Sequence, residues 1–409
     1  MEKGVINDKI YVVGHKNPDT DSICSAIAYA DLRTKITGEQ HNARRAGHLN
    51  EETQYVLDFF DVKAPALLTD LRVQVKDVAL RELDGIKGSV SIKTAWAKMK
   101  EESIKTLPVT RNGKLEGLIT IGDIATSYMD VYDSGILSQA RTQYRNIAST
   151  VDGEILIGNE HSYLLKGKVG IMSSSRKQVA DFVEENDLVI IGNRIEAQQL
   201  AVDLNVGCMV IGSNTEVPEQ ILEQAREKEI VIITTPHDTF TVARLINQSI
   251  PVRQFMTKRE KLIVFKMRDY VDDVKDIMMK IRYRDFPVVD NKGNFLGFIS
   301  RRRLLNCRKK QVILVDHNEK NQAVDGIEQA DVLEIIDHHR LSSIETMAPV
   351  FFRNQPVGCT ATIIYQMYQE NAIKVPKTIA GLLCSAIISD TLMFRSPTCT
   401  PLDEMSARQ

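Results

Sequence analysis

Three short apolar stretches that end abruptly in acidic residues and histidines constrain the fold most. "KIYVV" runs into "GHKNPDTDS" at residues 14–22, while "VILV" and "LEII", near residues 312 and 333, run into "DHNE" and "DHHR". In an open parallel sheet the carboxyl ends of the strands lie along one edge, where ligands bind. The pattern therefore predicts an α/β protein whose sheet gathers strands from distant parts of the chain.

Helical stretches accompany these strands. "SICSAIAYADL" follows the first strand, and we expect Thr20 or Asp21 to cap it. "IAGLLCSAIISDT" is a second apolar helical stretch that ends in an aspartate, Asp390. The final residues, "FRSPTCTPLDEMSARQ", contain two prolines and show no closing strand or helix pattern.

The acids and imidazoles at these ends predict a metal centre. A single aspartate after a strand is more often a turn former or a helix cap, but four of the eight histidines fall in the three short stretches. Carboxylates suit hard divalent cations, and added imidazole favours manganese or cobalt over calcium. These loops contain no cysteine, which argues against a thiolate zinc site. The residues concerned are His15, Asp19, Asp21, Asp316, Asp337, His338, His339 and Asp390.

The number of acids favours two cations. A pair about 3.5–4 Å apart clamps a phosphate, lowers the pKa of a water between them and stabilises the leaving oxygen. Phosphoryl hydrolysis is thus favoured over redox chemistry. The sequence shows no P-loop, which disfavours an NTPase route.

An internal repeat separates the two groups of motifs. Residues 91–125 and 270–305 each contain an amphipathic helix, "LPV" or "FPV", a turn at "RNGK" or "DNKGN", and "GLIT" or "GFIS". Such self-similarity predicts two like modules that pack together. The segment between them, about residues 135–250, has its own α/β rhythm and predicts a third small domain.

Composition narrows the class of partner and the compartment. The 409 residues include 52 basic and 54 acidic ones, and a net charge of −2 argues against nucleic acid held by bulk charge. No apolar run approaches the roughly 18 residues of a membrane span, and the N-terminus lacks a signal-peptide pattern. Six scattered cysteines without CxxC spacing indicate a reducing cytoplasm.

"GHKNPDTDS", "VDHNE", "DHHR" and "SDT" together resemble the DHH phosphoesterase superfamily and, within it, the family II inorganic pyrophosphatases. The interrupting repeat resembles the nucleotide-regulated form, in which paired CBS modules flank a DRTGG domain. The resemblance implies a parallel-sheet DHH catalytic domain interrupted by a CBS–DRTGG–CBS α/β insert. We expect the catalytic domain at residues 1–68 and 307–409, the CBS modules at 69–130 and 251–306, and the DRTGG-like domain at 131–250.

The same resemblance assigns roles at the metal centre. It implies hydrolysis of pyrophosphate to two phosphates with two Mn²⁺ or Co²⁺ ions, and Mg²⁺ accompanying the substrate. Asp337 would orient the imidazoles. Lys16 would contact the charge of a phosphate or remain a solvated surface lysine. His317 would contact a metal ligand without binding the metal itself. His339 would act as an acid or orient the substrate, and it is expected to be catalytic together with Asp316 and His338. The implied ligands are His15 and Asp19 for one metal, Asp21 and His338 for the other, and Asp316 and Asp390 as bridges.

A nucleotide site is implied at the repeats. "GLITIGD" places Thr120 and Asp123 at phosphate and ribose, whereas the second repeat has Ser300 and Arg303 there, so one complete site is expected. Regulators would be AMP and ADP as inhibitors and ATP or diadenosine polyphosphates as activators, acting on a homodimer. The alternative is that the modules only stabilise a dimer and Tyr283 only packs. Further candidate residues are Met256, in "QFMT", and Arg282, Tyr283 and Arg284.

Two departures from the family pattern leave other functions open. The sequence contains no match to the DHHA2 lobe, whose basic residues grip pyrophosphate, so weak or absent activity is expected of these 409 residues. "NRIEAQ" at 193–198 departs from the DRTGG motif, and a spacer or dimer contact is expected there. The rival functions are another DHH phosphoesterase, acting on polyphosphate or short oligonucleotides, and an inactive module that binds adenine nucleotides.

Overall fold

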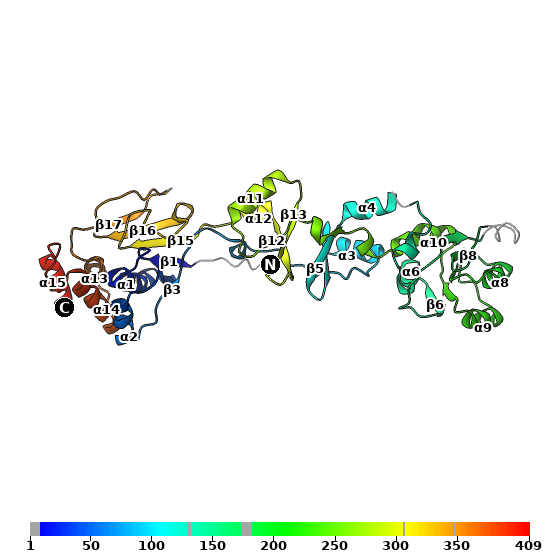
Figure 1. Cartoon of the computed structure of the whole chain (residues 1–409), viewed down its shortest axis with the longest axis horizontal. Coiled ribbons are helices and arrows are strands. Elements are labelled where there is room, and N and C mark those ends of the chain that lie inside the picture. Colours follow the sequence, from blue (N-terminus) through cyan, green and yellow to red (C-terminus); the bar gives the residue numbers. More distant parts are fainter. Residues whose placement is uncertain (1–8, 130–131, 173–181, 306, 347) are drawn as a thin grey trace. The chain divides into compact units, whose positions relative to one another are not determined.

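The computed structural model describes residues 9–129, 132–172, 182–305, 307–346 and 348–409 (Figure 1). Contacts divide the chain into two compact units. Unit 1 comprises Met1–Ala79, Met267–Arg282 and Arg301–Gln409, and unit 2 comprises Leu80–Lys266 and Tyr283–Ser300. The expected domain boundaries at Asp130, Val131 and Asn306 lie outside the described residues.

Unit 1 is built on a six-stranded sheet with the order β17-β16-β15-β1-β2-β3 (Figure 1). Every neighbouring pair is parallel. Strand β1 pairs with β15, so that Val13 lies opposite Leu314. This confirms the predicted parallel sheet built from both ends of the chain. The strands are β1 (Ile10–Val13), β2 (His41–Arg45), β3 (Ala66–Leu67), β15 (Gln311–Val315), β16 (Asp331–Asp337) and β17 (Phe351–Asn354).

Alternate side chains of this sheet enter two different cores. Val12 and Ile313 pack with helices α1, α13 and α14 on one face. Val13 and Leu314 pack with Leu71 on the other. Burial on both faces explains why these strands are continuously apolar rather than alternating. The helices of unit 1 are α1 (Thr20–Thr37), α2 (Glu51–Phe59), α11 (Val271–Lys280), α12 (Arg301–Leu305), α13 (Thr360–Glu370), α14 (Lys377–Asp390) and α15 (Pro401–Arg408), with 3₁₀ turns η1 (Val75–Asp77) and η5 (Ile327–Gln329).

Two expectations about helix ends in unit 1 are wrong. Asp19, and neither Thr20 nor Asp21, caps α1, because its carboxylate accepts a hydrogen bond from the Ser22 backbone N–H. The final residues also form a helix, α15, with Pro401 in its first turn and a capping box between Thr400 and Asp403. Proline suits the first turn of a helix because its missing N–H would lack an intrahelical partner there.

Unit 2 contains the paired hairpins of the internal repeat. Strands β4 and β5, and likewise β13 and β14, form antiparallel hairpins, each with one register shift. The two hairpins contact each other, because the Leu115 N–H donates to the Gly293 carbonyl and the Phe295 N–H to the Gly113 carbonyl. The predicted packing of two like modules is confirmed. The elements are α3 (Ile92–Glu101), β4 (Thr106–Arg111), β5 (Lys114–Thr120), α4 (Ile121–Met129), β11 (Thr257–Lys258), β12 (Phe265–Lys266), β13 (Asp285–Val289) and β14 (Phe295–Ser300), with 3₁₀ turns η3 (Val252–Gln254) and η4 (Arg259–Lys261).

The third predicted α/β region is also present in unit 2. Its sheet has the order β6-β10-β9-β8-β7, with β6 antiparallel and the other pairs parallel. Strands β8 and β9 are wholly buried. The elements are α5 (Ile136–Gln139), α6 (Tyr144–Thr150), β6 (Glu154–Ile157), β7 (Val169–Ile171), β8 (Leu188–Ile191), α8 (Ile195–Asp203), β9 (Cys208–Ile211), α9 (Glu219–Glu227), β10 (Val231–Thr234), α10 (Thr239–Leu245) and the 3₁₀ turn η2 (Ile246–Ser249). Among the described residues of both units, every helix is too short or too polar to span a bilayer.

Candidate metal centre

The loop after β1 is shaped by a close approach to helix α1. A Cβ at Gly14 would lie 1.9 Å from Ser22 Oγ, so glycine is required there. The same Ser22 hydroxyl accepts a hydrogen bond of 3.1 Å from the His15 N–H. Because Asp19 caps α1 with one carboxylate oxygen, its other oxygen faces His15. The turn thus presents His15 and Asp19 together.

His15, Asp19 and Asp316 form the first candidate ligand group. His15 Nε2 lies 3.5 Å from Asp19 Oδ2 and 3.3 Å from Asp316 Oδ2. One ligand atom from each residue lies within 4.8 Å of the others. Oxygen and nitrogen ligands at about 2.0–2.2 Å from a cation have such separations. The predicted ligand pair His15 and Asp19 is therefore assembled from one turn.

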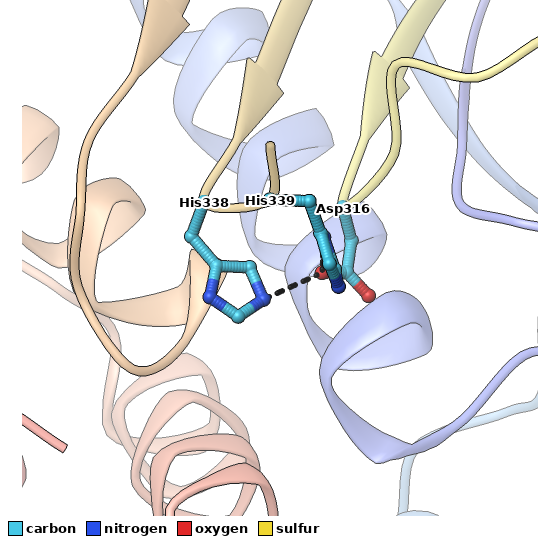
Figure 2. Close-up of side chains that lie close together, drawn as sticks. All are labelled: Asp316, His338 and His339. Atoms are coloured by element: carbon cyan, nitrogen blue, oxygen red, sulfur yellow. Dashed lines mark ion pairs between the residues drawn. The ribbon is translucent and has the colours of Figure 1, made fainter. Parts of the chain in front are cut away.

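His338 and Asp390 lie at the other side of Asp316. His338 Nε2 is 3.5 Å from Asp316 Oδ1 and 3.5 Å from Asp390 Oδ2. Figure 2 shows His338 on the loop after β16, directed at Asp316 after β15. His338 Nδ1 donates to the Val357 carbonyl at 3.0 Å, so Nε2 is the nitrogen whose lone pair a cation would take in place of a proton.

Unpartnered buried atoms support a cation here. The described residues include several buried polar atoms without a hydrogen-bond partner, and two of these atoms, His338 Nε2 and Asp390 Oδ2, belong to this cluster. Burying such groups costs free energy unless a partner or a metal compensates. A nitrogen lone pair beside two carboxylates is a donor set that suits a borderline divalent cation such as Mn²⁺ or Co²⁺.

Asp21 is one of the fully buried carboxylates of the cluster, with 1% of its surface exposed. Its Oδ1 accepts from Ser25 Oγ at 2.6 Å and from the Ala361 N–H at 3.1 Å, while Oδ2 accepts from the Thr360 N–H at 2.7 Å. Asp21 therefore sits on the N-terminus of α13, where the exposed N–H groups favour an anion.

Asp316 joins the two groups and has an unusual backbone. Its φ is +63°, in the left-handed region that aspartate tolerates better than most residues. Its two carboxylate oxygens face different imidazoles, Oδ2 facing His15 and Oδ1 facing His338. This arrangement fits the predicted bridging role. Asp390 lies on the His338 side, where it forms a further set of possible metal ligands with Asp21 and Cys359. The bridging role of Asp390 stays a prediction.

Asp337 orients the second histidine of the "DHH" motif. Its Oδ1 accepts from the His339 ring Nδ1 at 2.9 Å and from the backbone N–H of both His338 and His339. Asn318 donates to its other oxygen. Burial opposes ionisation of Asp337, but the hydrogen bonds from His339 outweigh it and lower the pKa of Asp337. His339 is half exposed beside Asp316, consistent with a place next to substrate.

The charges of the cluster favour an added cation. Burial lowers the pKa of His15 and His338, but the neighbouring aspartates outweigh it and raise both pKa values to about 10. Burial raises the pKa of Asp390 to about 6 and, with the charges of Asp316 and Asp390, raises that of Asp21 well above its usual range. Clustered carboxylates with raised pKa values are costly to ionise unless positive charge lies among them.

Lys16 and His317, the two motif residues whose roles were left open, have different surroundings. Lys16 pairs with Asp325 at 2.6 Å and is partly exposed. His317 is fully buried, donates from Nδ1 to the Val315 carbonyl, and lies edge-on to the His15 ring. Burial lowers the pKa of His317 to about 4, so its ring is neutral at physiological pH.

Sequence reasoning missed the residues that α13 contributes. Thr360 contacts both Asp21 and Asp316, and Cys359 lies with Asp21 and Asp390. Burial raises the pKa of the Cys359 thiol well above its usual value, which disfavours a thiolate ligand. The available signal was "GCT" ahead of an apolar helical run, where Thr360 opens the helix.

The predicted nucleotide residues lie apart from this centre in the sequence. Thr120 and Asp123 bond to each other at 2.8 Å at the start of α4. Met256 is partly buried against Gly117. Tyr283 and Arg284 are exposed in unit 2, and Arg282, also exposed, ends a segment of unit 1. That these residues form one site stays a prediction.

Comparison with known proteins identifies the family. The model of the DHH family, N-terminal domain, matches residues 9–387. A cobalt-dependent inorganic pyrophosphatase of Clostridium perfringens is 42% identical over 405 residues, which are 99% of this chain and 74% of that protein. A probable manganese-dependent inorganic pyrophosphatase of Thermotoga maritima is 35% identical over 98% of this chain and 73% of its own length. The chain therefore belongs to the DHH family and, within it, to the metal-dependent inorganic pyrophosphatases.

A solved structure matches the regulatory part. The CBS and DRTGG domains of the regulatory region of C. perfringens pyrophosphatase, complexed with the activator diadenosine tetraphosphate, match 56% of this chain and 100% of that chain. The match has 34% sequence identity and a TM-score of 0.54. It confirms the predicted combination of a DHH domain with a CBS–DRTGG insert.

Proposed function

We propose that this protein hydrolyses inorganic pyrophosphate to two phosphates with two Mn²⁺ or Co²⁺ ions. The observation that carries the proposal is the position of Asp316, whose two oxygens face the separate ligand groups around His15 and His338. Relatives that align with nearly the whole chain are named as cobalt- or manganese-dependent pyrophosphatases.

The proposal assigns a separate role to each residue of the metal centre. His15 and Asp19 would hold one cation, Asp21 and His338 would hold the other, and Asp316 and Asp390 would be shared by both. When bound, such a pair of cations neutralises phosphate charge and activates water, and Mg²⁺ accompanies the substrate. His339, fixed by Asp337, orients the phosphate or gives a proton to the departing one.

Phosphate release tests the substrate. The chain, loaded with Mn²⁺, is given pyrophosphate, polyphosphate or short oligonucleotides at equal phosphate concentration. Turnover by these 409 residues is expected to be weak, and we expect pyrophosphate to be cleaved fastest and to suppress cleavage of the others in competition. Preference for polyphosphate or an oligonucleotide would favour another DHH phosphoesterase. Metal and nucleotide binding without turnover would favour the inactive module.

Adenine nucleotides are the proposed regulators. The supporting observations are the match to regulatory domains that bind diadenosine tetraphosphate and the Thr120–Asp123 pair at the start of α4. In this proposal the Asp123 carboxylate accepts hydrogen bonds from the hydroxyls of the ribose. AMP and ADP inhibit, ATP and diadenosine polyphosphates activate, and the protein is a homodimer. Six free cysteines fit the proposed cytoplasmic location.

An arginine substitution tests this nucleotide site. Arg284 is exposed, so Arg284→Ala should leave the fold intact while removing a phosphate contact. A hydrogen bond to a charged group contributes about 1.5–3 kcal/mol. We therefore expect calorimetry to show a roughly 10–100-fold higher Kd for AMP. Arg302→Ala, an exposed arginine outside the candidate set, is the control. Equal AMP affinity in both variants would remove Arg284 from the site.

A further inference from the structure

We propose that Thr360 is a positioning residue that holds the Asp316 carboxylate at the angle at which one oxygen faces each cation. The inference rests on the proposed two-metal function. Thr360 is the first residue of α13 and is fully buried. Thr360 belongs to none of the motifs at the strand ends, since it lies 44 residues beyond Asp316 in the sequence.

Thr360 contacts two of the proposed ligands at once. Its hydroxyl Oγ1 donates to Asp316 Oδ1 at 3.0 Å, and its backbone N–H donates to Asp21 Oδ2 at 2.7 Å. The backbone contact does not depend on the side chain, but the hydroxyl contact does. Replacing the side chain therefore separates an effect on Asp316 from an effect on Asp21.

The hydroxyl contact selects one orientation of the Asp316 carboxylate. Rotation about the bond to a carboxylate carbon is soft, so neighbouring groups decide its angle. Asp316 Oδ2 faces His15 at 3.3 Å and Oδ1 faces His338 at 3.5 Å, and the Thr360 hydroxyl bonds only the latter oxygen. A carboxylate oxygen has two lone pairs, so Oδ1 can accept from Thr360 and still bind a cation on the His338 side.

The start of α13 is itself firmly held. The Asp403 carboxylate, fully buried in α15, accepts from the Gly358 N–H at 2.9 Å and from the Thr362 hydroxyl at 2.6 Å. It also accepts from Thr400 Oγ1 at 2.6 Å. Thr360 therefore projects from an anchored helix end rather than from a free loop, which is the condition for a side chain to orient another group.

Valine substitutions at two neighbouring threonines test the inference. Thr360→Val keeps the size of the side chain and removes the hydroxyl. Thr362→Val is the matched control, because Thr362 is equally buried in the same helix and its hydroxyl also bonds an aspartate, Asp403, outside the metal centre. Calorimetric titration of the whole chain with Co²⁺ and with Mn²⁺ gives stoichiometry and affinity without using activity.

In Thr360→Val we expect the more weakly bound of the two ions in the centre to have a Kd about 10–100-fold higher than in the parent. Losses of this size are found when other groups that orient metal ligands are removed. Thr360→Ser, which keeps the hydroxyl, should bind like the parent. Thr362→Val, which leaves the bond from the Gly358 N–H to Asp403 in place, should weaken binding less than Thr360→Val. If valine at 360 prevents folding, Thr360→Ser and Thr360→Ala give the same comparison, since they differ only in the hydroxyl.

Two results would overturn the inference. Parental affinity in Thr360→Val, or equal weakening in Thr360→Val and Thr362→Val, would show that the hydroxyl does not orient Asp316. Failure of the parent chain to bind two ions would instead contradict the proposed function, so the two failures are distinguishable.

Discussion

The Asp316→Asn variant should lose at least one of the two bound ions and at least ~10³-fold in kcat/KM, equivalent to about 4 kcal/mol of transition-state stabilisation. Asparagine has one oxygen where aspartate has two, and Asp316 presents one oxygen to His15 and the other to His338. Asparagine also tolerates the left-handed backbone, φ +63°, so the backbone need not change. Metal analysis after gel filtration and phosphate release from pyrophosphate measure the two losses.

The control for Asp316→Asn makes the same chemical change elsewhere in the sheet. Asp331 begins β16, at the opposite end of that strand from Asp337, and is exposed. Asp331→Asn should keep both ions and parental turnover. Stoichiometric binding of two ions by Asp316→Asn would contradict the bridging role of Asp316.

Asp21→Asn should lose the second ion and destabilise unit 1. The Asp21 carboxylate accepts from three donors, the Ser25 hydroxyl and the N–H groups of Thr360 and Ala361. The amide of asparagine would place an N–H₂ group against one of these donors. A buried donor left without an acceptor costs about 1–3 kcal/mol. The melting temperature measured with a chelator present should therefore fall.

Added Mn²⁺ separates the two effects of Asp21→Asn. In the parent, cation at about a thousandfold above its Kd stabilises the folded state by roughly 4 kcal/mol. The variant should show a smaller rise of its melting temperature with Mn²⁺ than the parent. An equal rise in both proteins would exclude Asp21 as a ligand, even if the chelated variant melts early.

The sequence predicted the parts of the site that depend on local pattern. Apolar runs ending in Asp316 and Asp337 are strands because both faces of the sheet are buried, and their carboxyl ends meet at one edge. His15 and Asp19 come from a single turn, so their proximity follows from spacing.

The remaining contacts depend on tertiary packing. Thr360 reaches Asp21 across 339 residues of sequence, and no local pattern encodes that contact. Cys359 enters the cluster for the same reason. The cap of α1 was misassigned because three adjacent polar residues, Asp19, Thr20 and Asp21, can each cap a helix, and the bond from Ser22 decides among them. Helix α15 was missed because it is only eight residues long and opens with a proline.

Diffraction at the manganese absorption edge, from crystals grown with Mn²⁺, is the most direct measurement of the two-metal centre. We predict two anomalous peaks about 3.5–4 Å apart on either side of the Asp316 carboxylate. One should lie among His15, Asp19 and Asp316, and the other beside Asp21, His338 and Asp390. A single peak, or peaks away from Asp316, would contradict the account.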